Sequence, residues 1–295
     1  MTQRDPFELV GPRELPPVET PRRRWWQGRP VAALAVLAVL VAGCALSAAL
    51  DGGQAGYMDL AHASEAPSAQ FWLGTDAMGR DLWRMVWAGG AVSLVVGVLA
   101  AAVSTAVAVV VGALSGCAPA WADGIAMRAV DVFLSVPSLL LAIFVQAILG
   151  EPTVLSLSVV LGLTGWASMA KVVRTEVIRL RRSEYVVAAR AMGGGFLYVL
   201  VRHLAPNFLS SIMFMVVMSV RSAIVAESTL SFMGLGLPVE TVSWGSMLSL
   251  AERALMSGAW WVVVVPGVVL VVTLLCVTSV GEWLRAGSGR GESNL

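Results

Sequence analysis

Charge is scarce in this chain of 295 residues. Only 13% of its residues are Asp, Glu, Lys or Arg, whereas an ordinary soluble domain has about 25%. Hydrophobic residues make up 57%, and the mean hydropathy is +0.79. Because one water-soluble core cannot bury so much apolar surface, the composition predicts an integral membrane protein. We expect no nucleic-acid partner.

Lysine is almost missing, and with it one common means of binding ATP. Lys171 is the single lysine, and Val172 follows it. A phosphate-binding loop needs the pattern Gly-x4-Gly-Lys-Ser/Thr, because its lysine reaches the β and γ phosphates of the nucleotide. The chain lacks this pattern, so ATP and Mg²⁺ would have to be bound by another chain. We expect no enzyme activity and no cofactor in this chain.

Cysteine and histidine are also few. Cys44, Cys117 and Cys276 lie in or beside apolar stretches, without the spacing of metal ligands. His62 and His203 are too distant in the sequence to suggest a metal site. We expect packed thiols and no bound metal.

The stretch that ends at Cys44 has two interpretations. Val41-Ala42-Gly43-Cys44 follows three arginines and an apolar run, as a bacterial lipoprotein cleavage site does. The other interpretation is an ordinary first transmembrane helix that contains small residues. The helix is favoured, because Cys44 lies inside the apolar run and five further spans follow.

Six apolar stretches predict six transmembrane helices and an all-α polytopic fold. Five have about the ~20 residues that cross a bilayer, and the second is longer. Pro137 lies near the start of the third stretch, where a lost backbone hydrogen bond costs least. The predicted spans are residues 31–50, 89–116, 132–150, 153–170, 207–227 and 260–280.

The segments outside the spans are polar or amphipathic. Residues 89–281 form a core of five spans, and the first span precedes it. The other segments are an N-terminal arm at 1–30, a loop at 51–88, a short connection at 117–131, a basic loop at 171–206, a glycine-rich segment at 228–259 and a tail at 282–295.

Arginine is concentrated in two of these segments. The arm carries six basic residues and the loop at 171–206 carries seven, whereas residues 51–88 carry two. With six spans, both basic segments and the tail fall on one side of the membrane. The positive-inside rule makes that side the cytoplasm. Both termini are therefore predicted to be cytoplasmic, and 51–88 and 228–259 are predicted to be periplasmic.

The basic loop has the pattern of an elbow. Residues 179–192 favour a short helix, in which Ala188-Ala189 leaves a patch that another chain could approach closely. Gly193-Gly194-Gly195 ends that helix, because glycine enters left-handed geometry freely. Pro206 then lies where the fifth span begins. A connecting loop whose arginines hold anionic lipid headgroups is the alternative.

The spacing within this elbow resembles the EAA motif of binding-protein-dependent ABC importer permeases. Ala188-Ala189, three residues, Gly193, nine residues and His203-Leu204-Ala205-Pro206 carry the resemblance. Val187 stands where the usual glutamate would be, and Ala205 stands where leucine is common. The resemblance implies a coupling helix that docks into a groove on a cytoplasmic ATPase. Its expected contact residues are Tyr185, Ala188, Ala189, Arg190, Gly193, His203 and Pro206.

Other blocks are similar to one branch of that family, the dipeptide/oligopeptide/nickel permeases, and within it to the C-type subunit. The first block is an LGTDxxGRD pattern before the second span, and the second is AESTLSFMGLG at 226–236. Ser243-Trp244-Gly245 and the run from Trp260 through Pro266-Gly267 also fit. The residues of this chain that match the first block are Leu73, Gly74, Thr75, Asp76, Gly79, Arg80 and Asp81.

The role of the LGTDxxGRD block has two candidate explanations. Asp76, Arg80 and Asp81 could form an ion-pair and capping network that fixes the loop. Alternatively, the block could contact the substrate-binding protein that the resemblance implies.

Charges within the spans point to an interior or aqueous path, because lipid exposure is costly. Arg221 and Glu227 are six residues apart and do not share a helical face, so a direct pair is not expected. Together with Ser231 and Trp244 they are candidates to line the pathway. A partner from a second permease is the alternative for Arg221. For Trp244, packing or an interface contact is the simplest interpretation, and a role at the outer mouth is the alternative.

The resemblance implies a bacterial inner-membrane permease of an ATP-driven importer. It would form half of a translocation pathway with a second homologous permease, two ATPase subunits and an extracytoplasmic binding protein, embedded in the lipid bilayer. Peptides are the expected substrate, with nickel or a metal chelate as the alternative. A self-sufficient secondary transporter or channel is the rival from another class. It would favour inverted repeats and paired intramembrane charges, and neither is evident.

Overall fold

A computed structural model describes residues 30–288 of the chain except 51–52, 200–201, 203 and 239. Its regular elements are helices, and one isolated β-bridge joins Thr75 to Asp81. The structure is therefore all-α, as the sequence predicted.

Four helices are long and apolar enough to cross a membrane. They are α1 (Val31–Leu50), α2 (Leu82–Cys117), α9 (Ala205–Phe232) and α12 (Trp261–Ser288). Two bent pairs can each supply one more crossing, which gives up to six. The pairs are α3 (Ala120–Ser135) with α4 (Ser138–Leu149), and α5 (Val154–Gly165) with α6 (Ala167–Leu180).

The first bent pair corrects two sequence predictions. Residues 117–131 are mostly the helix α3 and not a short connection, and residues 132–150 are not one straight span. α3 and α4 meet at an angle of 87°. Pro137 explains the break, because a proline lacks the backbone N–H and keeps the preceding residue extended. Val136 has φ −93° and ψ 129°, as that rule expects.

Helix ends also differ from the predicted boundaries. α2 begins seven residues before the predicted position, because the Asp81 side chain accepts a hydrogen bond from the Trp83 N–H at 2.9 Å and caps it. α6 extends to Leu180, within the predicted loop at 171–206, and α12 extends into the predicted tail. Hydropathy marks the part of a helix that lies in lipid, whereas helices continue beyond it.

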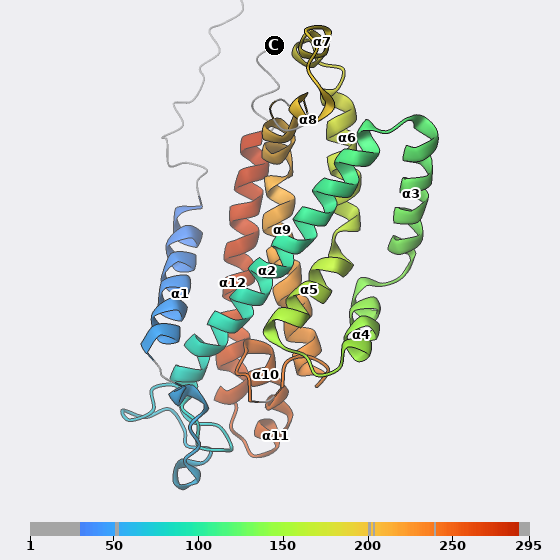
Figure 1. Ribbon diagram of the computed structural model, residues 1–295. Coiled ribbons are helices and arrows are strands. Elements are labelled where there is room, and N and C mark those ends of the chain that lie inside the picture. The colour runs from blue at the N-terminus through green and yellow to red at the C-terminus, as the bar shows by residue number, and fades with distance from the viewer. Residues whose placement is uncertain (1–29, 51–52, 200–201, 203, 239, 289–295) are drawn as a thin grey trace, which may run out of the picture.

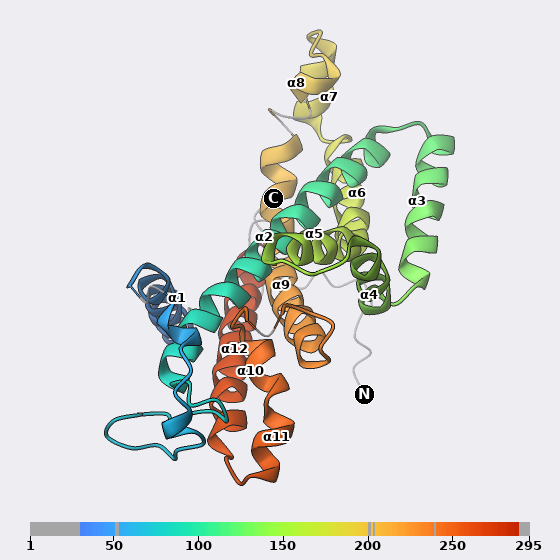
Figure 2. The ribbon, with the colours of Figure 1, turned by 60° about the horizontal axis from the view of Figure 1, so that its bottom comes forward.

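The long helices form a bundle that α2 crosses obliquely (Figure 1). α2 packs on α5, α6 and α9, while α1 lies at one edge against α2 and α12. α3 and α4 lie at the opposite edge. Figure 2 shows the same arrangement after rotation.

The two ends of the bundle carry different structures. One end carries α7 (Glu184–Ala191) and α8 (Phe196–Val199). The other carries α10 (Trp244–Ser249), α11 (Ala251–Met256) and the loop of residues 53–81. We refer to them as the elbow end and the loop end.

Glycines allow α2 to approach its neighbours closely. A Cβ on Gly112 would lie 2.5 Å from the Ala170 carbonyl oxygen of α6, and one on Gly97 would lie 2.6 Å from Ile224 Cγ1 of α9. Such distances are shorter than van der Waals contact. Small residues are common at helix interfaces in membranes, because attraction there depends on close packing.

Candidate functional site

The elbow at residues 184–199 is attached to the bundle by one apolar face. Val186 and Ala189 of α7 are buried and lie one helical turn apart. They belong to a cluster with residues of α6, α8 and the beginning of α9, namely Val173, Val177, Leu180, Val199, Leu204 and Phe208. The elbow is thus packed onto two of the long helical segments at once.

The opposite face of α7 is exposed. Tyr185, Val187 and Ala188 lie there, and Met192, which directly follows the helix, has an exposed fraction of 82%. The expectation that Ala188-Ala189 forms one open patch is wrong, because successive residues of a helix point about 100° apart. Ala189 faces the bundle, and only Ala188 is available to another chain.

Glycine ends α7 as predicted. Gly193 has a φ of +88°, and the N–H of Gly194 donates to the Ala189 carbonyl at 3.0 Å. This left-handed residue is the usual means of ending a helix. The predicted helix at 179–192 is nevertheless two helices, because α6 ends at Leu180 and a turn at Ser183 precedes α7.

The remaining elbow residues are placed only in part. Arg190 lies within α7, and Pro206 occupies the first turn of α9, where its missing N–H has no partner to lose. His203 lies outside the described residues.

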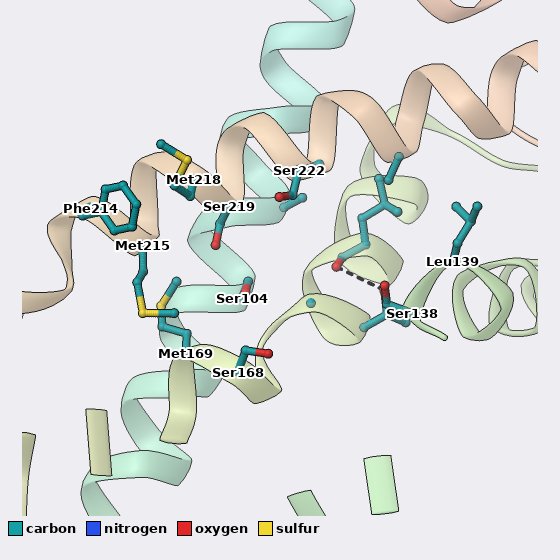
Figure 3. Close-up of a pocket in the computed structure, with 16 residues that line it drawn as sticks. Ser104, Ser138, Leu139, Ser168, Met169, Phe214, Met215, Met218, Ser219 and Ser222 are labelled. Atoms are coloured by element: carbon teal, nitrogen blue, oxygen red, sulfur yellow. Dashed lines mark hydrogen bonds between the residues drawn. The ribbon is translucent and has the colours of Figure 1, made fainter. Parts of the chain in front are cut away.

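A cleft of about 370 Å³ lies between α2, α4, α5, α6 and α9 (Figure 3). Its walls carry hydroxyls, thioethers and apolar groups, and none of the described residues that line it is charged. The hydroxyl residues are Ser104, Ser138, Thr164, Ser168, Ser219 and Ser222, and the larger apolar side chains are Leu139, Leu161, Met169, Phe214, Met215 and Met218.

The bend between α5 and α6 helps to form this cleft. The two helices meet at 52° around Trp166, next to Gly165. A Cβ on Gly165 would lie 3.9 Å from Ser104 Oγ, with no nearer atom of another residue. Glycine at this corner therefore places no side chain against the Ser104 hydroxyl.

Glu227 lies at the centre of a buried network on the loop-end side of the cleft. Its side chain is fully buried. Oε1 accepts hydrogen bonds from Ser231 Oγ at 2.9 Å and Ser243 Oγ at 2.7 Å. Oε2 accepts from Ser93 Oγ at 3.0 Å and from Ser228 Oγ at 3.3 Å. One carboxylate therefore joins α2, α9 and the N-cap of α10.

Trp244 completes the contact between α10 and α2. Its backbone N–H donates to Ser93 Oγ at 3.2 Å, and its ring Nε1–H donates to the Val86 carbonyl at 2.9 Å. Its side chain is fully buried. Full burial of Glu227 and Trp244 does not fit the prediction that they line the pathway, because neither reaches an open surface in this chain. Both join helices.

The other two candidates for the pathway, Ser231 and Arg221, have different surroundings from Glu227 and Trp244. Ser231 lines a second cavity, of about 350 Å³, which Gln146 and Ser249 also line. Arg221 is half-buried in α9, outside the lining of the first cleft. Its buried Nε has no hydrogen-bond partner within the part of the chain that the structure describes. Its role stays a prediction.

The LGTDxxGRD loop is held by its own side chains. Arg80 Nε donates to Asp76 Oδ2 at 2.7 Å, and both residues are buried. Asp76 Oδ1 accepts from the N–H groups of Met78 and Arg80, each at 2.9 Å. Together with the Asp81 cap on α2, these bonds form the ion-pair and capping network that the sequence suggested.

The remaining residues of the motif attach the same loop to the helical bundle. Gly74 and Gly79 have φ values of +77° and +73°. Thr75 Oγ1 donates to the His62 carbonyl at 2.5 Å, and Trp261 Nε1 donates to the Thr75 carbonyl at 3.0 Å. Leu73 packs in the cluster that contains Trp261. The motif thereby ties the loop to the start of α12.

Sequence reasoning missed the cleft and its serines. Ser104, Ser168 and Ser219 lie in or next to predicted spans, and isolated serines in spans are common enough to give no signal. Only the bend after Gly165 and the packing of α2 on α9 bring them together. Among the described residues no group of three or more His, Cys, Asp or Glu side chains is placed to hold a metal ion.

Comparison with known proteins agrees with this architecture. Residues 108–288 match the family described as binding-protein-dependent transport system inner membrane component. The match covers α3, α4, the elbow and the cleft walls from α4, α5, α6 and α9, whereas Ala100 and Ser104 of the α2 wall precede it.

Individual relatives match over most of the chain. A Brucella suis biovar 1 protein named as a peptide permease protein is 36% identical over 239 residues, which are 80% of this chain and 79% of the relative. The dipeptide transport system permease protein DppC of Bacillus subtilis is 35% identical, over 74% of this chain and 68% of the relative. The oligopeptide transport system permease protein OppC of the same organism is 34% identical, over 77% and 74%. This chain therefore belongs to the family of inner membrane components of binding-protein-dependent transport systems.

Proposed function

We propose that this chain is a membrane permease subunit of an ATP-driven importer and that peptides are its substrates. The names of the relatives support peptides, and nothing in the comparisons favours nickel or a metal chelate. The chain carries no ATP-binding loop of the Walker type in its sequence. The energy must come from two ATPase subunits that bind ATP and Mg²⁺.

The single observation that carries the mechanism is the shared attachment of the elbow. Val186, Ala189 and Val199 of the elbow share one buried cluster with residues of α6 and α9. These two helices also contribute Ser168, Met169, Met215 and Ser219 to the cleft. A displacement of α7 by a docked ATPase would therefore move two walls of the cleft. Packed side chains transmit such a displacement because protein interiors compress little.

The proposed assembly has further members. A second homologous permease would close the open side of the cleft, where Ser138 and Ser222 are exposed. An extracytoplasmic binding protein would deliver the peptide at the loop end. ATP binding would draw the two ATPases together and open the pathway outward, and hydrolysis would reset it. The elbow end and both termini would then lie in the cytoplasm of a bacterial cell, with the bundle in its inner membrane.

A pair of glycine variants tests the elbow. Gly193→Val places a β-branched residue at a φ of +88°, which costs about 1–2 kcal/mol and shifts the turn after α7. Gly195→Val is the matched control, because it lies in the same turn, a Cβ there meets no atom within 4 Å, and its φ is not positive. The complex is reconstituted in vesicles with its ATPases and binding protein.

We expect Gly193→Val to reduce peptide import at least tenfold and to abolish the stimulation of ATP hydrolysis by the loaded binding protein. Gly195→Val should retain both. If import and stimulation both survive in Gly193→Val, the elbow does not transmit ATPase motion. Peptide uptake by the chain alone, without ATPases, would instead support the secondary transporter or channel.

A further inference from the structure

We infer that the cleft between α2, α5, α6 and α9 binds the main-chain amides of a peptide in transit, with the Ser104 hydroxyl as its fixed anchor. The inference rests on the proposed function and adds the part of the substrate that this chain recognises. The contact would be made to N–H and C=O groups that all peptides share, and not to particular side chains or to the charged termini.

Ser104 is the first observation that points to a ligand. Its exposed fraction is 3%, and its Oγ has no hydrogen-bond partner among the described residues. Several other hydroxyls in the helices donate to their own helix, as Ser158 does to the Val154 carbonyl at 2.6 Å and Thr273 to the Val269 carbonyl at 2.8 Å. The Oγ1 of Thr105 is also buried without a partner among the described residues, but Thr105 does not line the cleft. A buried hydroxyl without a partner is unfavourable, so Ser104 is expected to find one in the cleft that it lines.

A second feature, the glycine at the corner between α5 and α6, keeps side chains away from this hydroxyl. Gly165, at the corner between α5 and α6, faces Ser104 without a side chain, and a Cβ there would be 3.9 Å from Oγ. Any larger residue would extend into the gap. The volume of the cleft, about 370 Å³, lies within the range of small-molecule sites in proteins.

The chemistry of the walls selects the ligand class. A hydroxyl both donates and accepts hydrogen bonds, so it matches the alternating N–H and C=O groups of a peptide. Figure 3 shows Ser168, Ser219 and Ser222 around the same space as Ser104. Among the described residues that line the cleft there is no carboxylate, imidazole or thiol. These residues offer no set of ligands for a metal ion and no counter-charge for a peptide terminus.

The thioethers explain how peptides of different sequence could pass. Met169, Met215 and Met218 lie on the α6 and α9 walls of the cleft. Methionine is unbranched and polarisable, and surfaces rich in it adapt to varied apolar partners. Fixed hydroxyls for the main chain and adaptable thioethers for the side chains are consistent with a site that tolerates many peptides.

The test compares import of a tripeptide with import of the same tripeptide methylated at its central backbone nitrogen. The reconstituted complex of the full chain, its partner permease, ATPases and binding protein is used. Both peptides are supplied at concentrations that saturate the binding protein, which is measured separately. The variants are Ser104→Ala, Ser104→Thr, which keeps a hydroxyl, and Ser158→Ala, a buried serine outside the cleft.

Ser104→Ala should slow import of the parent tripeptide about two- to tenfold, the effect of losing one uncharged hydrogen bond. It should also bring the import rates of the two peptides close together, whereas the wild-type chain and Ser104→Thr should prefer the parent. The melting temperature of Ser104→Ala should not fall, because no internal hydrogen bond is lost. Ser158→Ala should keep the wild-type preference.

Two results would overturn the inference. One is a Ser104→Ala variant with wild-type import and wild-type preference between the two peptides. The other is a loss of import that accompanies a lower melting temperature or failure to assemble with the partner permease, which would mean that Ser104 serves packing. If the wild-type complex imports neither peptide, the proposed function itself fails. That outcome differs from the two results above, in which the wild-type complex still imports the parent peptide.

Discussion

At the scale of single residues, a few polar side chains fix the loop end of the bundle. Glu227 accepts four hydroxyl hydrogen bonds in a site with no exposed surface. A carboxylate out of water is tolerated only when hydrogen bonds replace its hydration. The serines around it are thus not interchangeable with alanine, although each is a small residue in an apolar segment.

Glu227→Ala should lower the free energy of unfolding by on the order of 3 kcal/mol, because it leaves buried hydroxyls without an acceptor. Glu227→Gln should cost less, since one carbonyl oxygen remains. Thermal unfolding of the purified protein in detergent measures both. Glu282→Ala, which changes an exposed acid of α12, provides the comparison and should unfold as the wild type does. Equal melting temperatures for Glu227→Ala and Glu282→Ala would show that the network contributes nothing.

A second residue-scale prediction concerns the LGTDxxGRD loop. Gly79→Ala would place a Cβ 1.7 Å from the Asp59 carbonyl oxygen, at a φ of +73°. The loop must rearrange, and we expect faster cleavage of residues 53–81 by protease added to the intact protein. Gly56→Ala is the matched control in the same loop, because its Cβ meets no atom within 4 Å. Identical cleavage rates for the two variants would argue against the tight packing of Gly79.

At the scale of elements, backbone breaks decide where helices bend. Pro137 separates α3 from α4, and the corner at Trp166 separates α5 from α6. Ion pairs join α3, which precedes the first of these breaks, to α6, which follows the second. Asp123 of α3 pairs with Arg174 of α6, and Asp131 pairs with Lys171. These pairs hold α3 beside α6.

The contact between α2 and α6 provides an element-scale prediction. Gly112→Ala should reduce stability by roughly 1–3 kcal/mol, because its Cβ would lie 2.5 Å from the Ala170 carbonyl oxygen and the helices must separate. Gly124→Ala in α3 should be neutral or stabilising by about 0.5–1 kcal/mol, since its Cβ meets no atom and alanine favours helix. Thermal unfolding of the two variants compares them directly. A less stable Gly124→Ala than Gly112→Ala would contradict this packing.

At the scale of the whole molecule, the elbow and the cleft are connected by α6 and α9. The elbow packs on the ends of these helices and the cleft lies farther along them. Beyond the cleft, the Glu227 network joins α9 to α2 and α10. α9 therefore links all three regions, which gives motion at the elbow a continuous packed route to the loop end. α1 lies outside this route, at the edge of the bundle.

The sequence by itself determined the class of the protein and the places where the chain turns. Low charge and long apolar runs require lipid, and Gly193 and Pro206 mark helix ends through properties of their own backbone. These signals are local, so no tertiary contact is needed to interpret them. The all-α fold and the glycine-terminated elbow were predictable for that reason.

Only the tertiary structure decided what the polar residues inside the bundle do. Glu227 and Trp244, two candidates for the pathway, are buried between helices, while Ser104, which no sequence pattern singled out, lines a cleft. Periodicity reports that a residue lies in a span, but not which neighbour it faces. That neighbour depends on the oblique path of α2, the 52° bend after Gly165 and the glycines that set the distances between helices.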